Sequence, residues 1–295
     1  MTATALTLVL LASFIHAGWN FLTKRAGDRL VFLWLGVGAG LVLYLPVMVW
    51  TASHYPVPLA GLPFILVSGS IHFCYYYALS RLYEYDFSLA YPMARGSSPV
   101  LVAIVSLLFL GEGLSAWGVA GIFTVVAGIA ALQIQVLPSG APGGRSKVIW
   151  PLKQAIRGPA GRIALATALT IALYSTVDKG GVARVNPIVY LWGVHLVAFV
   201  AWSFRMIPRW AEVVAEARRS PRALLAIGVG QNLAYILVLF AMRLAPVAYV
   251  VPAREVSTLI GSALGVLVLR EAFPTAKLTG AALIVAGVAL IATLG

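Results

Sequence analysis

Two arginines in this sequence lie inside stretches that are otherwise apolar. Arg95 is in YPMARGSSP, within residues 87–110, and Arg254 is in VPAREVST, within residues 244–269, where Glu255 follows it. A guanidinium carries five N–H donors in a planar fork that can hold a carboxylate through two parallel hydrogen bonds. The arginines therefore indicate either a site for a small anion or an internal ion-pair network. Glu255 leaves both interpretations open for Arg254, whereas Arg95 has no acid in its own segment, which favours contact with a substrate.

Aromatic and polar side chains accompany the arginines in some of the apolar segments. Other segments, such as 30–52 and 114–136, contain almost no polar residues. Any single ring is as well explained by ordinary packing, but several rings beside one cation suit a small zwitterion or an organic acid with an apolar body. The candidate substrate-binding residues are Trp19, Asn20, His72, Tyr75, Tyr76, Tyr91, Arg95, Tyr174, Trp192, Asn232, Tyr235 and Arg254.

The composition indicates that a lipid bilayer surrounds these segments. Of the 295 residues, 61% are hydrophobic and 10% are charged, whereas about 25% are charged in an ordinary soluble domain. Crossing the hydrocarbon core takes about 20 helical residues. We therefore expect an all-α polytopic membrane protein with ten transmembrane helices, at residues 3–23, 30–52, 60–82, 87–110, 114–136, 161–182, 187–206, 222–243, 245–269 and 274–294.

The helix positions place both arginines near the middle of the membrane. At a rise of about 1.5 Å per residue, Arg95 lies about 12 Å and Arg254 about 15 Å from the start of its helix. Pro92 and Pro252 precede them within one turn, and a proline removes a backbone donor and kinks a helix. The pattern predicts two interrupted helices at matching depths, which is typical of a transporter's binding site.

Coupling of transport to protons needs a titratable group inside the membrane. Glu255 is the carboxylate that these boundaries place near the midplane, so it is the first candidate. Otherwise His16, His72 or His195 could serve, because imidazole titrates near neutral pH.

The sequence does not support an enzyme, since it has neither a phosphate-binding P-loop nor a G-x-S-x-G motif. Four scattered histidines and the single Cys74 indicate no metal site, and we expect no cofactor.

The net charge of +12 follows membrane topology rather than nucleic-acid binding. Sixteen Lys and Arg residues fall on the side that faces the first interhelical loop, and three fall on the opposite side. Cytoplasmic loops are enriched in Lys and Arg. The split therefore predicts that both termini are periplasmic and that the protein is a multi-pass protein of the cell inner membrane.

The two halves of the sequence repeat each other. An offset of 159 residues sets Arg95 on Arg254 and Glu112 on Glu271, and it also sets Gly121 on Gly280 and Gly128 on Gly287. Five helices in each copy is an odd number, so the second copy must enter the bilayer inverted. We expect a first repeat at residues 1–136, a cytoplasmic linker rich in Gly, Pro and basic residues at 137–160, and an inverted repeat at 161–295. The paired glycines indicate close helix contact within one chain.

These features resemble one known family. The segments HAGWNFLTK and YPMAR, the joints LFLGE and LVLRE, and the five-plus-five organisation are similar to the EamA family of the drug/metabolite transporter superfamily. Bacterial exporters of amino acids, including aromatic ones, belong to that superfamily. The resemblance implies a central cavity between the repeats, lined by the first, third and fourth helices of each.

The sequence and the resemblance together predict a secondary transporter. We expect export of amino acids or related small metabolites by alternating access, from a monomer whose partners are the small-molecule substrate and the lipid bilayer. The alternative is a transporter or exchanger of phosphorylated or nucleotide-linked metabolites, which should require more cations in the cavity than Arg95 and Arg254.

Overall fold

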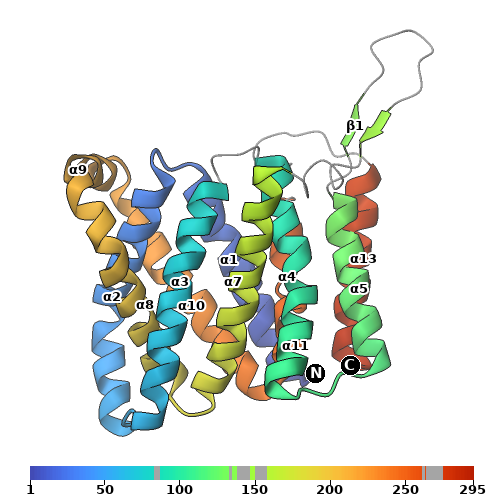
Figure 1. Ribbon diagram of the computed structural model, residues 1–295, viewed down its shortest axis with the longest axis horizontal. Coiled ribbons are helices and arrows are strands. Elements are labelled where there is room, and N and C mark those ends of the chain that lie inside the picture. The colour runs from blue at the N-terminus through green and yellow to red at the C-terminus, as the bar shows by residue number, and fades with distance from the viewer. Residues whose placement is uncertain (83–86, 133–134, 138–146, 150–157, 261–262, 264–274) are drawn as a thin grey trace.

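The computed structural model is a bundle of helices that lie side by side (Figure 1). It describes the whole chain except residues 83–86, 133–134, 138–146, 150–157, 261–262 and 264–274. Both termini lie at one end of the bundle, and the short strands β1 and β2 lie at the other end (Figure 1). The strands, Gln135–Leu137 and Lys147–Ile149, pair antiparallel and were not expected from the sequence.

The helices follow the predicted apolar segments. In chain order they are α1 (Ala3–Lys24), α2 (Arg29–His54), η1 (Leu59–Gly61), α3 (Leu62–Leu82), α4 (Phe87–Leu110), α5 (Ala116–Leu132), α7 (Pro159–Val182), α8 (Pro187–Met206), η2 (Ile207–Arg209), α9 (Trp210–Arg219), α10 (Pro221–Leu244), α11 (Val247–Ala253) and α13 (Thr275–Thr293).

The described part of the chain contains seven helical segments long and apolar enough to cross a membrane, together with two shorter apolar helices. The prediction that the membrane-spanning segments are helices is therefore confirmed for these segments. The count of ten spans stays a prediction, because much of the ninth predicted span lies outside the described residues.

Capping residues define where several helices begin. The side chain of Thr2 accepts a hydrogen bond from the backbone N–H of Ala5, and that of Asp28 accepts one from Val31. Asn186 does the same for the N–H of Ile188 at the start of α8. These side chains satisfy backbone donors that have no partner inside the helix, so the local sequence fixes the positions at which the apolar segments become helical.

Two pairs of glycines bring α5 and α13 into backbone contact. A Cβ atom added to Gly128 would lie 2.8 Å from the carbonyl oxygen of Gly280. A Cβ atom on Gly121 would lie 2.8 Å from the carbonyl oxygen of Gly287. Only a residue without a side chain fits such an approach. The predicted glycine contact within one chain is confirmed.

The two proline-containing helices differ from each other. The helix α4 continues through Pro92 without a break, so the prediction of an interruption there is wrong. The helix α11 ends at Ala253, a turn follows at Arg254 and Glu255, and helix resumes at residues 256–260. Pro92 lies close to the start of its helix, where little helix precedes the lost hydrogen bond, whereas Pro252 lies well inside the predicted span.

A short helix, α9, lies across one end of the bundle (Figure 1). The carboxylate of its buried Glu216 accepts hydrogen bonds from the backbone N–H groups of Gly27, at 3.3 Å, and Asp28, at 3.2 Å. Arg209 pairs with the carboxylates of Glu212 and Asp28, and these hydrogen bonds raise the pKa of its guanidinium. Helix α9 is therefore tied to the connection between α1 and α2.

Candidate substrate-binding site

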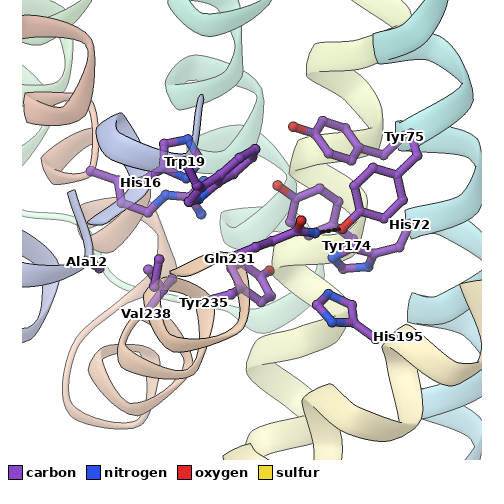
Figure 2. Close-up of a pocket in the computed structure, with 13 residues that line it drawn as sticks. Ala12, His16, Trp19, His72, Tyr75, Tyr174, His195, Gln231, Tyr235 and Val238 are labelled. Atoms are coloured by element: carbon purple, nitrogen blue, oxygen red, sulfur yellow. Dashed lines mark hydrogen bonds between the residues drawn. The ribbon is translucent and has the colours of Figure 1, made fainter. Parts of the chain in front are cut away.

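A pocket opens between helices from both halves of the sequence (Figure 2). The first half contributes residues of α1 and α3, and the second half contributes residues of α7, α8, α10 and the turn after α11. The lining residues are Ala12, His16, Trp19, His72, Tyr75, Tyr76, Tyr174, His195, Gln231, Ala234, Tyr235, Val238 and Arg254.

Helical periodicity places these side chains on shared faces. On α1 the lining positions are 12, 16 and 19, and on α10 they are 231, 234, 235 and 238. Positions spaced by three or four residues lie on one side of an α-helix. One face of α1, of α3 and of α10 therefore points toward the same pocket.

Aromatic rings form one wall of this space. The ring of Tyr174 lies 4.3 Å from that of His72, 5.5 Å from that of Tyr75 and 6.1 Å from that of Tyr235, measured between centroids. These separations are typical of tilted or edge-to-face aromatic contacts. Across the pocket, the rings of His16 and Trp19 meet at 4.7 Å (Figure 2). The pocket thus offers broad apolar surfaces to a flat ligand.

Three buried polar atoms in this lining have no hydrogen-bond partner among the described residues. They are Nε1 of Trp19, Oε1 of Gln231 and Nη1 of Arg254. The side chains that carry them are only 7%, 5% and 6% exposed, respectively. Buried polar groups are nearly always hydrogen-bonded in folded proteins. The pocket therefore offers two donors, one of them cationic, and one acceptor to a ligand or to water.

The neighbouring atoms fix the orientation of these groups. Gln231 donates through Nε2 to the hydroxyl of Tyr76 at 2.6 Å, which leaves its oxygen for the pocket. The guanidinium of Arg254 lies 5.7 Å from the ring centroid of Tyr235, within the range of a cation–π contact. Arg254 lies in the turn after α11, and its side chain lines the pocket.

Both halves of the chain match one transporter family. The family model matches twice, over residues 3–133 and 162–293. The chain belongs to the EamA-like transporter family. It is therefore a membrane transporter of small molecules, and its pocket is the candidate site for the transported compound.

Further comparisons bear on the fold of this EamA-like transporter. A solved structure named "Crystal structure of protein" is 20% identical, with a TM-score of 0.72, and the match covers 100% of this chain and 98% of that one. This likeness concerns the fold alone. No curated protein matches the chain.

Arg95 lies away from the lining of this pocket. Its Nε atom lies 3.2 Å from Oε2 of Glu255, and its Nη2 donates to the hydroxyl of Ser257 at 3.2 Å. Both charged side chains are almost completely buried. The sequence favoured Arg95 as the carboxylate contact and left Arg254 beside Glu255, but the structure pairs Glu255 with Arg95 and leaves Arg254 facing the pocket. Arg95 and Glu255 are 160 residues apart in the sequence, so their contact could not be predicted from neighbouring residues.

Other predicted residues lie beside the pocket rather than in its lining. Asn232 hydrogen-bonds Nδ1 of His195 at 3.0 Å and the carbonyl of Gly228 at 2.8 Å. Trp192 donates to the carbonyl of Leu41 at 2.9 Å, and Asn20 donates to that of His16 at 2.8 Å. The side chain of Tyr91 lies outside the described residues. None of the described α4 side chains lines the pocket, so the predicted role of the fourth helix is not seen.

Two polar residues of the candidate helices, Asp178 and Gln231, were not chosen as site residues from the sequence. Gln231 lines the pocket, and Asp178 is fully buried on α7, where it accepts hydrogen bonds from Ser68, Tyr190 and Tyr235. The interpretation that Glu255 is the principal carboxylate within the membrane is therefore incomplete. Both residues are polar and lie on helices that already carry candidate site residues, and this feature of the sequence could have identified them.

Proposed function

We propose that this transporter exports amino acids, aromatic ones in particular, across the cell inner membrane by alternating access. Ten helices in two inverted five-helix repeats, residues 1–136 and 161–295, surround the pocket, and a cytoplasmic linker at 137–160 joins them. Both termini are periplasmic.

The three unpartnered atoms of the pocket support this substrate class. Arg254 and Trp19 provide donors for a carboxylate, and Oε1 of Gln231 provides an acceptor for an ammonium group. The wall of tyrosines accommodates an aromatic body. A free amino acid with a ring carries all three features, and each pocket group then gains the partner that it lacks.

A phosphorylated substrate fits the pocket less well. A phosphate carries up to two negative charges and is commonly held by several cations or backbone N–H groups. Among the described lining residues, Arg254 is the only arginine, and no lysine accompanies it. The single guanidinium suits the single charge of a carboxylate.

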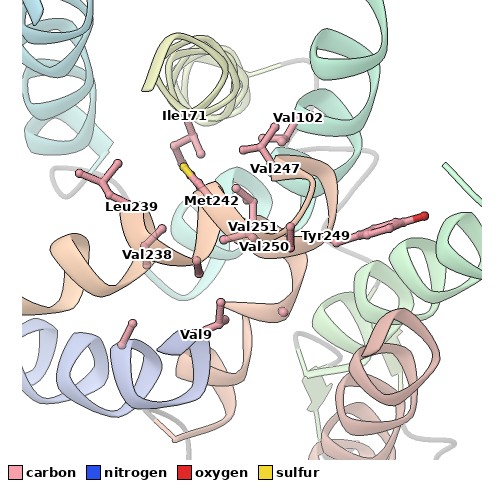
Figure 3. Packing of buried hydrophobic residues seen from close by; sticks show 14 of the residues in the cluster. Val9, Val102, Ile171, Val238, Leu239, Met242, Val247, Tyr249, Val250 and Val251 are labelled. Atoms are coloured by element: carbon pink, nitrogen blue, oxygen red, sulfur yellow. The ribbon is translucent and has the colours of Figure 1, made fainter. Parts of the chain in front are cut away.

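The side of the pocket toward the termini is closed, which supports alternating access. Beyond Val238 the chain of α10 continues into an apolar cluster with Met242, Val247 and Val251 (Figure 3). All four side chains are buried. A substrate can leave on this side only if α1, α10 and α11 separate.

A polar joint at the same end reinforces the closure. The carboxylate of Glu112 accepts hydrogen bonds from the backbone N–H groups of Val247, at 2.9 Å, and Ala248, at 3.3 Å. Lys179 lies 3.8 Å from this carboxylate and donates to the carbonyls of Met242 and Ala245. Opening of this side must break these interactions of Glu112 and Lys179.

Efflux from proteoliposomes tests the proposal. Vesicles that contain the purified protein are loaded with radiolabelled phenylalanine, alanine or a sugar phosphate, and release is compared with that from protein-free vesicles. We expect release of phenylalanine well above that of alanine. Release of the sugar phosphate alone would favour the alternative, and the absence of any amino-acid release would refute the proposal.

A further inference from the structure

Asp178 occupies a closed polar cage between four helices. It lies on α7, its side chain is 0% exposed, and its partners come from α3, α8 and α10. The hydroxyl of Ser68 donates to Oδ1, that of Tyr190 donates to Oδ1 at 2.8 Å, and that of Tyr235 donates to Oδ2 at 2.5 Å. A carboxylate buried within a membrane-spanning helix is costly and marks a functional site by default.

The cage supplies neutral donors rather than a cation. Among the described residues no ion pair includes Asp178, whereas Glu255 is paired with Arg95. The adjacent Lys179 directs its ammonium group to Met242, Ala245 and Glu112 instead. An ion pair favours the charged form of a carboxylate strongly, but hydroxyl groups can donate to the charged form and accept from the neutral form. Asp178 can therefore change its protonation state without leaving an unpartnered charge.

The helices packed against α7 carry other titratable or charged groups, and Arg254 acts on Asp178 electrostatically. These groups include His72 of α3, Arg95 in the described part of α4, Tyr190 and His195 of α8, Tyr235 of α10, Arg254 after α11, and Tyr174 and Lys179 of α7 itself.

Two side chains connect the cage to the pocket. Tyr235 lines the pocket and also donates to Asp178. The hydroxyl of Ser68 lies between Asp178 and Nδ1 of His72, which is 3.2 Å away, and His72 also lines the pocket. Protons can pass along such a chain of hydroxyl and imidazole groups. Hydrogen bonds therefore connect Asp178 to two residues of the pocket lining, Tyr235 and His72.

We propose that Asp178 carries the proton that is exchanged for the substrate, and that Tyr235 makes proton and substrate binding mutually exclusive. This inference rests on the proposed function, because it requires a substrate with an ammonium group. It replaces Glu255 as the first candidate for coupling.

The exclusion follows from the direction of one hydrogen bond. When Asp178 is ionised, the Tyr235 hydroxyl donates to it and turns its lone pairs toward the pocket, where they can accept from an ammonium group together with Gln231. When a proton from water binds Asp178, a new O–H bond forms and can point at the Tyr235 oxygen. The tyrosine proton must then turn away from the carboxyl group and toward the pocket, where it opposes the ammonium group. A proton thus enters as the amino acid leaves, and no other reactant is needed.

The test measures how the affinity for phenylalanine depends on pH in the purified, full-length protein. For the wild type, the Kd should rise as the pH falls, by up to about tenfold per pH unit, because one proton competes with one substrate. Asp178→Asn should bind weakly with a Kd independent of pH. Glu212→Gln, which changes an exposed carboxylate on α9, is the matched control and should behave as the wild type. An Asp178→Asn protein with the wild-type pH dependence would overturn the inference.

An infrared measurement without substrate makes the test independent of phenylalanine binding. Lowering the pH should produce the C=O stretching band of a buried carboxylic acid in the wild type and in Tyr235→Phe, but not in Asp178→Asn. Tyr235→Phe should keep this band and lose the pH dependence of its affinity. If the wild type lacks the band between about pH 5 and pH 9, Asp178 is not the proton carrier. A wild type that shows the band but binds no amino acid refutes the proposed function and the exchange, while leaving Asp178 as a proton-binding residue.

Discussion

Replacement of the two buried arginines should have opposite consequences. Arg254→Gln removes the charged donor whose Nη1 atom faces the pocket without a partner. A hydrogen bond to a charged group contributes about 1.5–3 kcal/mol, and about 1.4 kcal/mol corresponds to a tenfold change in affinity. The affinity for phenylalanine should therefore fall by roughly one to two orders of magnitude. The melting temperature should change less than in Arg95→Gln, because among the described residues no ion pair includes Arg254, whereas Arg95 is paired with Glu255.

Arg95→Gln is the matched variant, with the same change at the corresponding position of the other repeat. It removes the cation that lies 3.2 Å from Glu255 and leaves a carboxylate that is 1% exposed without its partner. Breaking a buried ion pair costs about 3–5 kcal/mol. Arg95→Gln should therefore lower the melting temperature by many degrees, while the protein that remains folded binds phenylalanine with nearly normal affinity.

Both variants are assayed by isothermal titration calorimetry with phenylalanine and by thermal unfolding in detergent. A well-folded Arg254→Gln protein with unchanged affinity would refute the role given to Arg254. An Arg95→Gln protein that melts normally and fails to bind would restore the sequence prediction that Arg95 holds the carboxylate.

Three further predictions follow from the same structure. Gly128→Ala should lower the melting temperature, because its Cβ would lie 2.8 Å from a backbone oxygen, whereas Gly113→Ala, with open space around the new Cβ, should not; equal melting temperatures would contradict the glycine contact. Trp19→Phe keeps a ring and removes the unpartnered indole N–H, so the affinity for phenylalanine should fall severalfold, whereas Trp117→Phe on the exposed face of α5 should leave it unchanged. Alkaline phosphatase fused after Gly295 should be active if the C-terminus is periplasmic, and bright fluorescence of a green fluorescent protein at that position would overturn the topology.

The sequence predicts the helices of this protein because the bilayer imposes a simple requirement on it. Each segment must satisfy its backbone polar groups internally and expose apolar side chains to lipid, and this constraint is visible in every window of about 20 residues. Residue spacing along a helix likewise predicts that the glycines of α5 and α13 lie on contacting faces and that His16 and Trp19 lie on one face of α1. The match of Arg95 with Arg254 likewise follows from the repeat in the sequence.

The choice between those two arginines was made only by the tertiary structure. Residue spacing gives the face of a helix but not the helix that the face meets, and Arg95 reaches Glu255 across the two repeats. That pairing leaves Arg254, in the turn that interrupts the ninth predicted span, as the guanidinium toward the pocket. Asp178 shows the same limit, because its hydroxyl partners Ser68 and Tyr235 lie 110 and 57 residues away in sequence. The chemistry of a membrane site depends on which buried groups neutralise one another, and such partners are brought together by the packing of whole helices.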